Sequence, residues 1–119
     1  MTKPTLPTIP FKSPKSFETW LEKQHDKSTG IWMKIYKKDS GIKTITYAEA
    51  LDVALCFGWI DGQKQAFDEE CWLQKFCPRT TKSIWSKVNI GHVERLIKND
   101  KMRPAGLKAI ESAKADGRW

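Results

Sequence analysis

The sequence predicts an α+β fold: a small antiparallel or mixed sheet of about three strands, packed with a single layer of four to five helices. Residues 31–37, IWMKIYK, alternate between two faces as a half-buried strand does. Residues 59–67 and 71–77 are two further strand-like segments joined by FDEE, which suits a hairpin turn. Residues 46–49, TYAE, match a capping box in front of an apolar helix.

The first twelve residues are expected to form an extended arm. They carry three of the six prolines, and proline fixes φ and supplies no amide donor. Ser13 and Pro14 then favour a helix start, with serine as N-cap and proline at the first helical position. Apolar residues at helical spacing extend this helix to about residue 27. Residues 13–119 therefore form one predicted domain.

The helix after the capping box is expected to be deeply buried. Its residues up to Phe57 are apolar on more than one side. Gly58 is the natural left-handed residue to end it. Before this helix, KDSG at 38–41 predicts a turn, and the extended segment 42–45 is a candidate to pair back onto the first strand.

Two more helices are predicted after Pro78, which ends the second strand of the hairpin. The polar segment PRTTKSIWSKVN leads to Asn89, an N-cap candidate for a helix with inward Ile90, Val93, Leu96 and Ile97. Pro104 opens the last helix, and Gly117 closes it. Its inward side chains are predicted to be Leu107, Ile110 and Ala113.

The chain has 119 residues and a formal net charge of +7. Its length suits one domain. A positive charge favours nucleic acid, phosphorylated ligands or an anionic membrane surface as partners. However, the lysines are spread from Lys3 to Lys114, and a dispersed charge is more often a solvated surface than a binding stripe.

No metal or cofactor is expected. The three cysteines, Cys56, Cys71 and Cys77, form no C-x-x-C pair, and the two histidines lack the spacing of a metal motif. Neither a signal peptide nor an apolar segment long enough to span a membrane is visible. The sequence thus favours reduced thiols in a cytoplasmic protein without an integral membrane segment.

Asp61 is the first candidate site residue. A carboxylate just past a buried helix end suits a general acid or base, or a ligand contact, and Gly62 would let a ligand approach. Alternatively, Asp61 and Gly62 form a bulge in the strand. The sequence leaves both interpretations open.

The segment from Arg79 to Lys87 is the second candidate. It offers cations, hydroxyl groups and an indole, which suit a phosphate or carboxylate and a stacked ring. The alternative is a structural loop whose hydroxyls make local turns and whose Trp85 fills the core. The candidate ligand-binding residues here are Arg79, Lys82, Ser83, Trp85 and Ser86.

Enzymatic activity has little support, so an enzyme is the least favoured interpretation. Cys56 lies on a buried helix, where a thiol is usually inert. There is no phosphate-binding loop and no dinucleotide fingerprint. Asp61 could act as acid or base, but no second catalytic group can be named beside it.

Three segments resemble the YdeI/OmpD-associated family, also described as bacteriocin-protection proteins: TITYAEALDVALCFGWIDGQ, PRTTKSIWSKVN and HVERLIKNDKMRPAGLKAIESAKADGRW. The resemblance runs from about residue 17 to residue 119. It implies a role in protection against bacteriocins, antimicrobial peptides or envelope stress, and it assigns no catalytic residues.

The resembling segments include residues 58–62, 79–89 and 117–119. If these converge, Trp59 and Trp85 would be the walls of one pocket, with Asp61, Arg79 and Lys82 as its polar groups. The leading interpretation is a small, soluble, basic binding module for an anionic small molecule or peptide. The alternative is a nucleic-acid-binding domain that uses the same basic segment.

Overall fold

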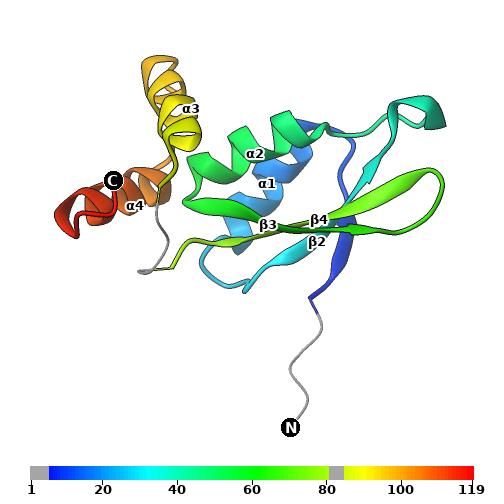
Figure 1. The fold of residues 1–119 in the computed structure, drawn as a ribbon, viewed down its shortest axis with the longest axis horizontal. Coiled ribbons are helices and arrows are strands. Elements are labelled where there is room, and N and C mark those ends of the chain that lie inside the picture. Colours follow the sequence, from blue (N-terminus) through cyan, green and yellow to red (C-terminus); the bar gives the residue numbers. More distant parts are fainter. Residues whose placement is uncertain (1–5, 81–84) are drawn as a thin grey trace, which may run out of the picture.

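The computed structural model describes residues 6–80 and 85–119. In this part of the chain, the elements follow the order β1 (Thr8–Pro10), α1 (Pro14–Gln24), β2 (Ile31–Tyr36), the 3₁₀ turn η1 (Lys38–Ser40), α2 (Tyr47–Cys56), β3 (Trp59–Ala66), β4 (Cys71–Pro78), α3 (Lys87–Lys98) and α4 (Pro104–Ala115). The α+β class is therefore confirmed. Helices α1 and α2 lie on one face of the sheet, whereas α3 and α4 lie beyond its end (Figure 1).

The sheet is mixed and has four strands in the order β1-β2-β4-β3. The predicted number, about three, missed β1, which pairs in parallel with β2 through Ile9 and Met33. This short strand lies in the expected N-terminal arm, and three residues ending in Pro10 are too few to show alternation. The other pairings are antiparallel: β3 pairs with β4, as the hairpin pattern predicts, and β2 pairs with β4.

The pairing of β3 with β4 is irregular between Asp61 and Lys64. Gln74 of β4 lies opposite this bulge, and its side chain is 3% exposed. Its amide donates hydrogen bonds to the carbonyl oxygens of Gly62 (3.0 Å) and Gln63 (3.3 Å). The buried amide thus satisfies backbone groups that the bulge takes out of the ladder.

The core lies between the sheet and the pair α1–α2. Phe17 and Leu21 of α1 are fully buried, and the ring of Phe17 packs 5.7 Å from that of Phe76 in β4. Trp59 is 1% exposed, and its indole N–H donates to the carbonyl oxygen of His25 at 3.2 Å. That bond fixes the start of β3 against the C-terminal end of α1.

Helix α1 begins as predicted, with Ser13 as N-cap and Pro14 in the first turn. It ends at Gln24 rather than at about residue 27, and the Gln24 carbonyl accepts from the N–H groups of both Lys27 (3.0 Å) and Ser28 (2.8 Å) in the turn that follows. The segment 42–45 forms no strand with β2. Instead, Ile45 N–H donates to the carbonyl oxygen of Phe11 at 3.0 Å.

The capping box of α2 is confirmed. Glu49 N–H donates to the Thr46 hydroxyl at 3.2 Å, and Thr46 N–H donates to the Glu49 carboxylate at 3.0 Å. Five of the ten residues in α2 are buried, which confirms the expected deep burial. Gly58 follows with φ of 77°, a left-handed conformation that glycine adopts without strain.

Helix α3 begins earlier than predicted. Its N-cap is Ser86, whose hydroxyl accepts from the N–H of Asn89 at 3.2 Å, so Asn89 lies inside the first turn. Helix α4 does begin at Pro104, and Gly117 follows with φ of 75°. Leu107, predicted to face inward, is 42% exposed.

The α3–α4 pair packs against α2 rather than against the sheet. Arg103 N–H donates to the carbonyl oxygen of Cys56 at 3.0 Å. A Cβ at Gly106 would lie 2.2 Å from that same oxygen, so only glycine allows this close approach. None of the helices described here is both long enough and apolar enough to cross a membrane.

Candidate functional site

Arg79, the first residue after β4, stacks on an aromatic pair. Its guanidinium carbon lies 3.7 Å from the centre of the Trp85 ring. The Trp119 ring lies 5.1 Å beyond, centre to centre. Arg79 N–H also donates to the Gly58 carbonyl oxygen at 3.0 Å. Because Trp85 is only 6% exposed, these contacts hold the half-buried guanidinium on a fixed support.

Arg118, which follows α4, lies close to the segment that contains Arg79. Its Nη1 donates to the Thr80 carbonyl oxygen at 3.2 Å. Its Nη2 donates to the Ser112 hydroxyl at 3.2 Å and to the Asp116 carboxylate at 3.0 Å. Arg118 therefore bridges the segment after β4 and the last turn of α4.

The two arginines line one small cavity, here called the arginine pocket. Its volume is about 110 Å³, and its lining residues are Arg79, Thr80, Ala109, Ser112 and Arg118. Burial, and then the neighbouring Arg118 cation, lower the pKa of Arg79 to about 10, against an opposing effect of Asp61. Two guanidinium groups and a hydroxyl at one cavity suit a carboxylate or phosphate group.

A larger depression, here called the α4 groove, adjoins the arginine pocket and shares Arg79, Ala109 and Ser112 with it. Its volume is about 530 Å³. One wall comes from α4: Pro104, Ala105, Lys108, Ala109 and Ser112. The other residues come from the ends of α1 and α2, from β3 and β4, and from the residue after β4: His25, Asp26, Phe57, Gly58, Trp59, Pro78 and Arg79. An open, partly apolar depression thus continues from the cationic pocket.

The predicted site residues fall in different places. Arg79 lines both cavities and Trp59 lines the α4 groove, while Trp85 supports Arg79 from beneath. Ser86 uses its hydroxyl to cap α3. Lys82 and Ser83 lie outside the described residues.

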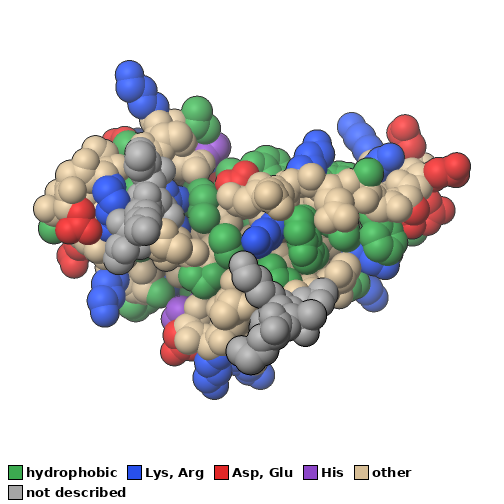
Figure 2. Space-filling model, turned by 60° about the horizontal axis from the view of Figure 1, so that its bottom comes forward, with side chains coloured by type: hydrophobic (Ala, Val, Ile, Leu, Met, Phe, Trp, Pro, Cys, Tyr) green, Lys and Arg blue, Asp and Glu red, His purple; other side chains and the backbone are tan. Residues whose placement is uncertain are grey.

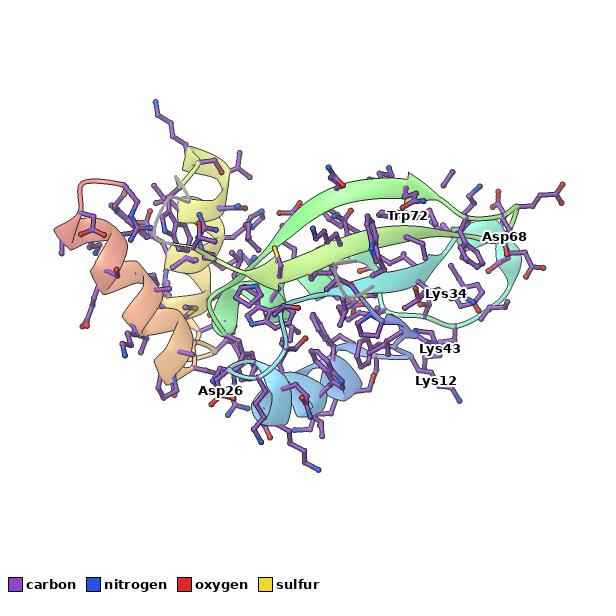
Figure 3. All side chains as sticks on the ribbon, turned by 90° about the horizontal axis from the view of Figure 1, so that it is seen from below. Lys12, Asp26, Lys34, Lys43, Asp68 and Trp72 are labelled. Atoms are coloured by element: carbon purple, nitrogen blue, oxygen red, sulfur yellow. The ribbon has the colours of Figure 1, made fainter. Side chains whose placement is uncertain are left out.

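Asp61 lies in a separate cluster near the start of α2. Its carboxylate accepts a hydrogen bond of 2.5 Å from the hydroxyl of Tyr47. Together with Gly62, Lys64, Trp72 and Gln74, these residues line a depression of about 390 Å³ that does not include Arg79. Figure 3 shows the separation: Trp72 lies toward the hairpin end of the sheet, and Asp26 of the α4 groove lies toward α4.

At neutral pH the Tyr47 phenol is a hydrogen-bond donor to Asp61 rather than a base. Burial, followed by the hydrogen bond and the charge of Asp61, raises the pKa of Tyr47 to about 12. The carboxylate is already engaged by the phenol. Lys64 lies over the Trp72 ring, 4.5 Å from its centre, and so covers that aromatic face. We interpret this cluster as a structural contact between α2 and β3.

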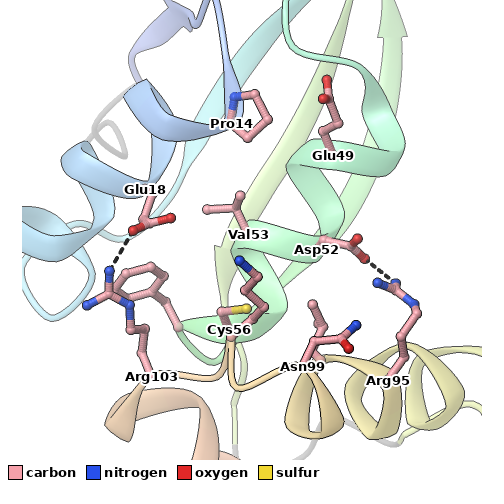
Figure 4. Close-up of a pocket in the computed structure, with 12 residues that line it drawn as sticks. Pro14, Glu18, Glu49, Asp52, Val53, Cys56, Arg95, Asn99 and Arg103 are labelled. Carbon is pink, nitrogen blue, oxygen red and sulfur yellow. Dashed lines mark hydrogen bonds and ion pairs between the residues drawn. The ribbon is translucent and has the colours of Figure 1, made fainter.

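A further cavity of about 290 Å³ lies between α1, α2 and α3 (Figure 4). Four of its charged residues form ion pairs: Arg95 contacts Asp52 at 2.8 Å, and Arg103 contacts Glu18 at 2.6 Å. Lys101 also lines the cavity. Glu49 belongs to the capping box. These pairs join the α3–α4 unit to α1 and α2, so we interpret the cavity as part of that interface.

The thiols and carboxylates of the described residues form no cluster of metal-ligating side chains. Among residues 6–80 and 85–119, no three His, Cys, Asp or Glu side chains are grouped to hold an ion. Cys56 is buried, and burial together with nearby carboxylates raises the pKa of its thiol to about 11. A thiol with that pKa is protonated and unreactive at neutral pH.

Arg118, Ser112 and Lys108 were not among the predicted site residues. Arg118 and Thr80 are far apart in the sequence, and no local pattern predicts that they meet. Two signals were available: the resembling segments included both 79–89 and 117–119, and Ser112 lies close to Arg118 along the chain. They were not sufficient to choose Arg118 as a polar group of the site.

The chain belongs to the family described as "Domain of unknown function (DUF8412)", whose model matches residues 9–109. The match covers all four strands except the first residue of β1, and it ends within α4, before Ser112 and Arg118. No curated protein matches the chain significantly. No solved structure does so either. The family description assigns no activity, so the function has to be argued from the site.

Proposed function

We propose that this domain is a binding module for an anionic ligand, whose carboxylate or phosphate group is held between Arg79 and Arg118. The observation that carries the proposal is the meeting of two guanidinium groups at one cavity of about 110 Å³. Burial, and then the Arg118 cation, disfavour the charge of Arg79 and lower its pKa. A bound anion would offset this repulsion, so both arginines gain from the same ligand.

The surroundings support binding more than catalysis. Arg79 is held on Trp85, and Arg118 is held by Ser112, Thr80 and the Asp116 carboxylate, so little side-chain freedom remains to be lost when a ligand binds. Of the described residues, cations and hydroxyl-bearing side chains line the cavity, but no carboxylate, imidazole or thiol does. Such a set of groups can hold an anion but offers no general base for chemistry.

The biological role in this proposal comes from the resemblance to the YdeI/OmpD-associated family. On that basis, binding of the anion would serve protection against antimicrobial peptides, bacteriocins or envelope stress. The site argument does not depend on this role, and the binding experiment tests the site alone.

The test is a titration with acetate and with inorganic phosphate, followed by NMR of the arginine side-chain Nε–H signals. We expect the signals of Arg79 and Arg118 to shift together and to saturate. Arg118→Gln should weaken binding by about tenfold or more, because it removes one of two charged donors. Arg95→Gln is the matched control, since Arg95 pairs with Asp52 in another cavity. Equal effects of the two variants would contradict the proposal.

A single-stranded oligonucleotide distinguishes the alternative function. The Lys and Arg side chains on the face drawn in Figure 2 lie singly rather than in one stripe. We therefore expect weak binding that involves few phosphates and falls only slightly with salt. A steep decrease in affinity with increasing salt would instead indicate release of many counterions and a nucleic-acid interface.

A further inference from the structure

One face of α4 forms a wall of the α4 groove along two helical turns. Ala105, Lys108, Ala109 and Ser112 are spaced by three and four residues, which places them on the same side of the helix. Ser112 lies beside the arginine pocket. Ala105 lies at the other end, where a further depression of about 200 Å³ continues past His25 and Pro104.

This wall has a defined length. Two helical turns from Ser112 to Ala105 correspond to about 10 Å, because an α-helix rises about 1.5 Å per residue. An extended peptide advances about 3.3 Å per residue, so about three residues fit along it. The side chains of Ala105 and Ala109 are small, and Gly58 packs directly against them, so that Gly58 forms the bottom of the groove.

The groove also has two electrically different ends. Arg79 and Arg118 mark one end, where the arginine pocket opens. Asp26 lines the groove beside His25, toward the other end. Glu22, near this second end, is already paired with Arg103 at 2.7 Å. Asp26 is therefore the carboxylate that can bind a positively charged group of the ligand. That group would lie about three peptide residues from the bound anionic group.

We propose that the ligand is a short peptide bound by its free carboxyl terminus. The carboxylate lies between Arg79 and Arg118, about three residues extend along α4, and the amino group approaches Asp26. This inference rests on the proposed anion site and adds the class of ligand. Three observations support the peptide: the length of the α4 wall, the small side chains on that wall, and the opposite charges at the two ends of the α4 groove.

The probe is trialanine, compared with acetate, trialanine amide and N-acetyl-trialanine in calorimetric titrations of the full chain. Trialanine is expected to bind about tenfold or more tightly than acetate, because it adds contacts along the groove. Amidation removes the carboxylate and should abolish binding. N-acetylation removes the positive amino group and should weaken binding by a few-fold.

Ala105→Leu tests the groove separately, because Ala105 lines the α4 groove but not the arginine pocket. It should weaken trialanine by about tenfold and leave acetate within about twofold. Ala115→Leu, at an exposed position on α4, is the matched control. If Ala105→Leu lowers the helix content, the Asp26→Asn variant is used as the test instead. That variant should weaken trialanine but not N-acetyl-trialanine.

The results separate the two proposals. If acetate shifts the Arg79 and Arg118 signals but trialanine binds no more tightly than acetate, the peptide inference is wrong and the anion site stands. The same conclusion follows if Ala105→Leu and Asp26→Asn both leave trialanine binding unchanged. If neither acetate nor trialanine affects the two arginines, both proposals are wrong.

Discussion

The backbone N–H of Trp85 donates a hydrogen bond of 3.2 Å to the carbonyl oxygen of Arg118. Trp85 is the residue before the N-cap of α3, and Arg118 follows α4, so this bond joins the two ends of the α3–α4 unit. The same contact places the Trp119 ring beside Trp85 and the Arg118 guanidinium at the arginine pocket. The position of the chain end and the geometry of the site are therefore linked.

Trp119→Ala tests this link. The ring contacts Trp85, and Lys114 lies 4.9 Å from its centre, so its removal should lower the free energy of unfolding by about 1–2 kcal/mol. Urea denaturation measures the loss. Trp119→Phe, which keeps an aromatic ring, should recover most of it. If both variants are as stable as the parent chain, the ring contact has no energetic role.

Ser86 was a candidate ligand-binding residue, and the structure places it as the N-cap of α3. We therefore expect Ser86→Ala to lower the free energy of unfolding by about 1 kcal/mol. Ser86→Asp should be close to neutral, because aspartate also caps helices well. Thermal and urea denaturation measure both effects. If Ser86→Ala instead loses acetate binding and keeps the stability of the parent chain, Ser86 is a ligand-binding residue.

Tyr47 should titrate well above an ordinary tyrosine. Its pKa is 10.0 in the unfolded chain and about 12 in the folded chain. Because the folded pKa is the higher one, its contribution to stability is fully present below pH 10 and is lost as the pH rises through 12. Ultraviolet titration in a Tyr36→Phe background follows Tyr47 alone. Asp61→Asn should lower this pKa only in part, since burial is the largest cause.

Two glycines in the C-terminal helices should respond oppositely to alanine. A Cβ at Gly106 would lie 2.2 Å from the Cys56 carbonyl oxygen and 2.7 Å from the Met102 methyl carbon. Gly106→Ala should therefore cost about 1–3 kcal/mol or more in unfolding free energy. Gly91, inside α3, has nothing within 4 Å of such a Cβ, so Gly91→Ala should add about 0.5–1 kcal/mol. Equal shifts in the denaturation midpoint would contradict the packing of α4 on α2.

The elements with strong local signals could be predicted from the sequence. The side chains of Thr46 and Glu49 satisfy amides within their own turn, and Pro14 and Gly58 have backbone preferences of their own, so no distant partner is needed. The start of α3 was ambiguous, because serine and asparagine are equally good N-caps. The choice of Ser86 places Trp85 immediately before the helix, where its ring is buried.

The site depended on contacts between distant segments and was harder to predict. Arg79 and Trp85 are close in sequence, and the segment that contains both was selected. Their meeting with Arg118 depends on how α4 packs, and this packing depends on the glycine contact at Cys56. The prediction placed Asp61 beside Arg79 and did not consider Tyr47. The Tyr47 hydroxyl lies next to the Asp61 carboxylate. The strand pattern allowed a bulge at Asp61 and Gly62, but it could not show this contact with α2.

The bulge in β3 has a consequence for how this molecule behaves at high concentration. β3 is an edge strand, and a regular edge can add a strand from another copy and begin aggregation. Here the ladder is interrupted between Asp61 and Lys64, with the Gly62 and Gln63 carbonyls turned toward Gln74. The opposite edge, β1, has only three residues and ends in Pro10. Both edges are thus poor templates for intermolecular β-pairing, and the Gln74 hydrogen bonds stabilise the irregular part of β3.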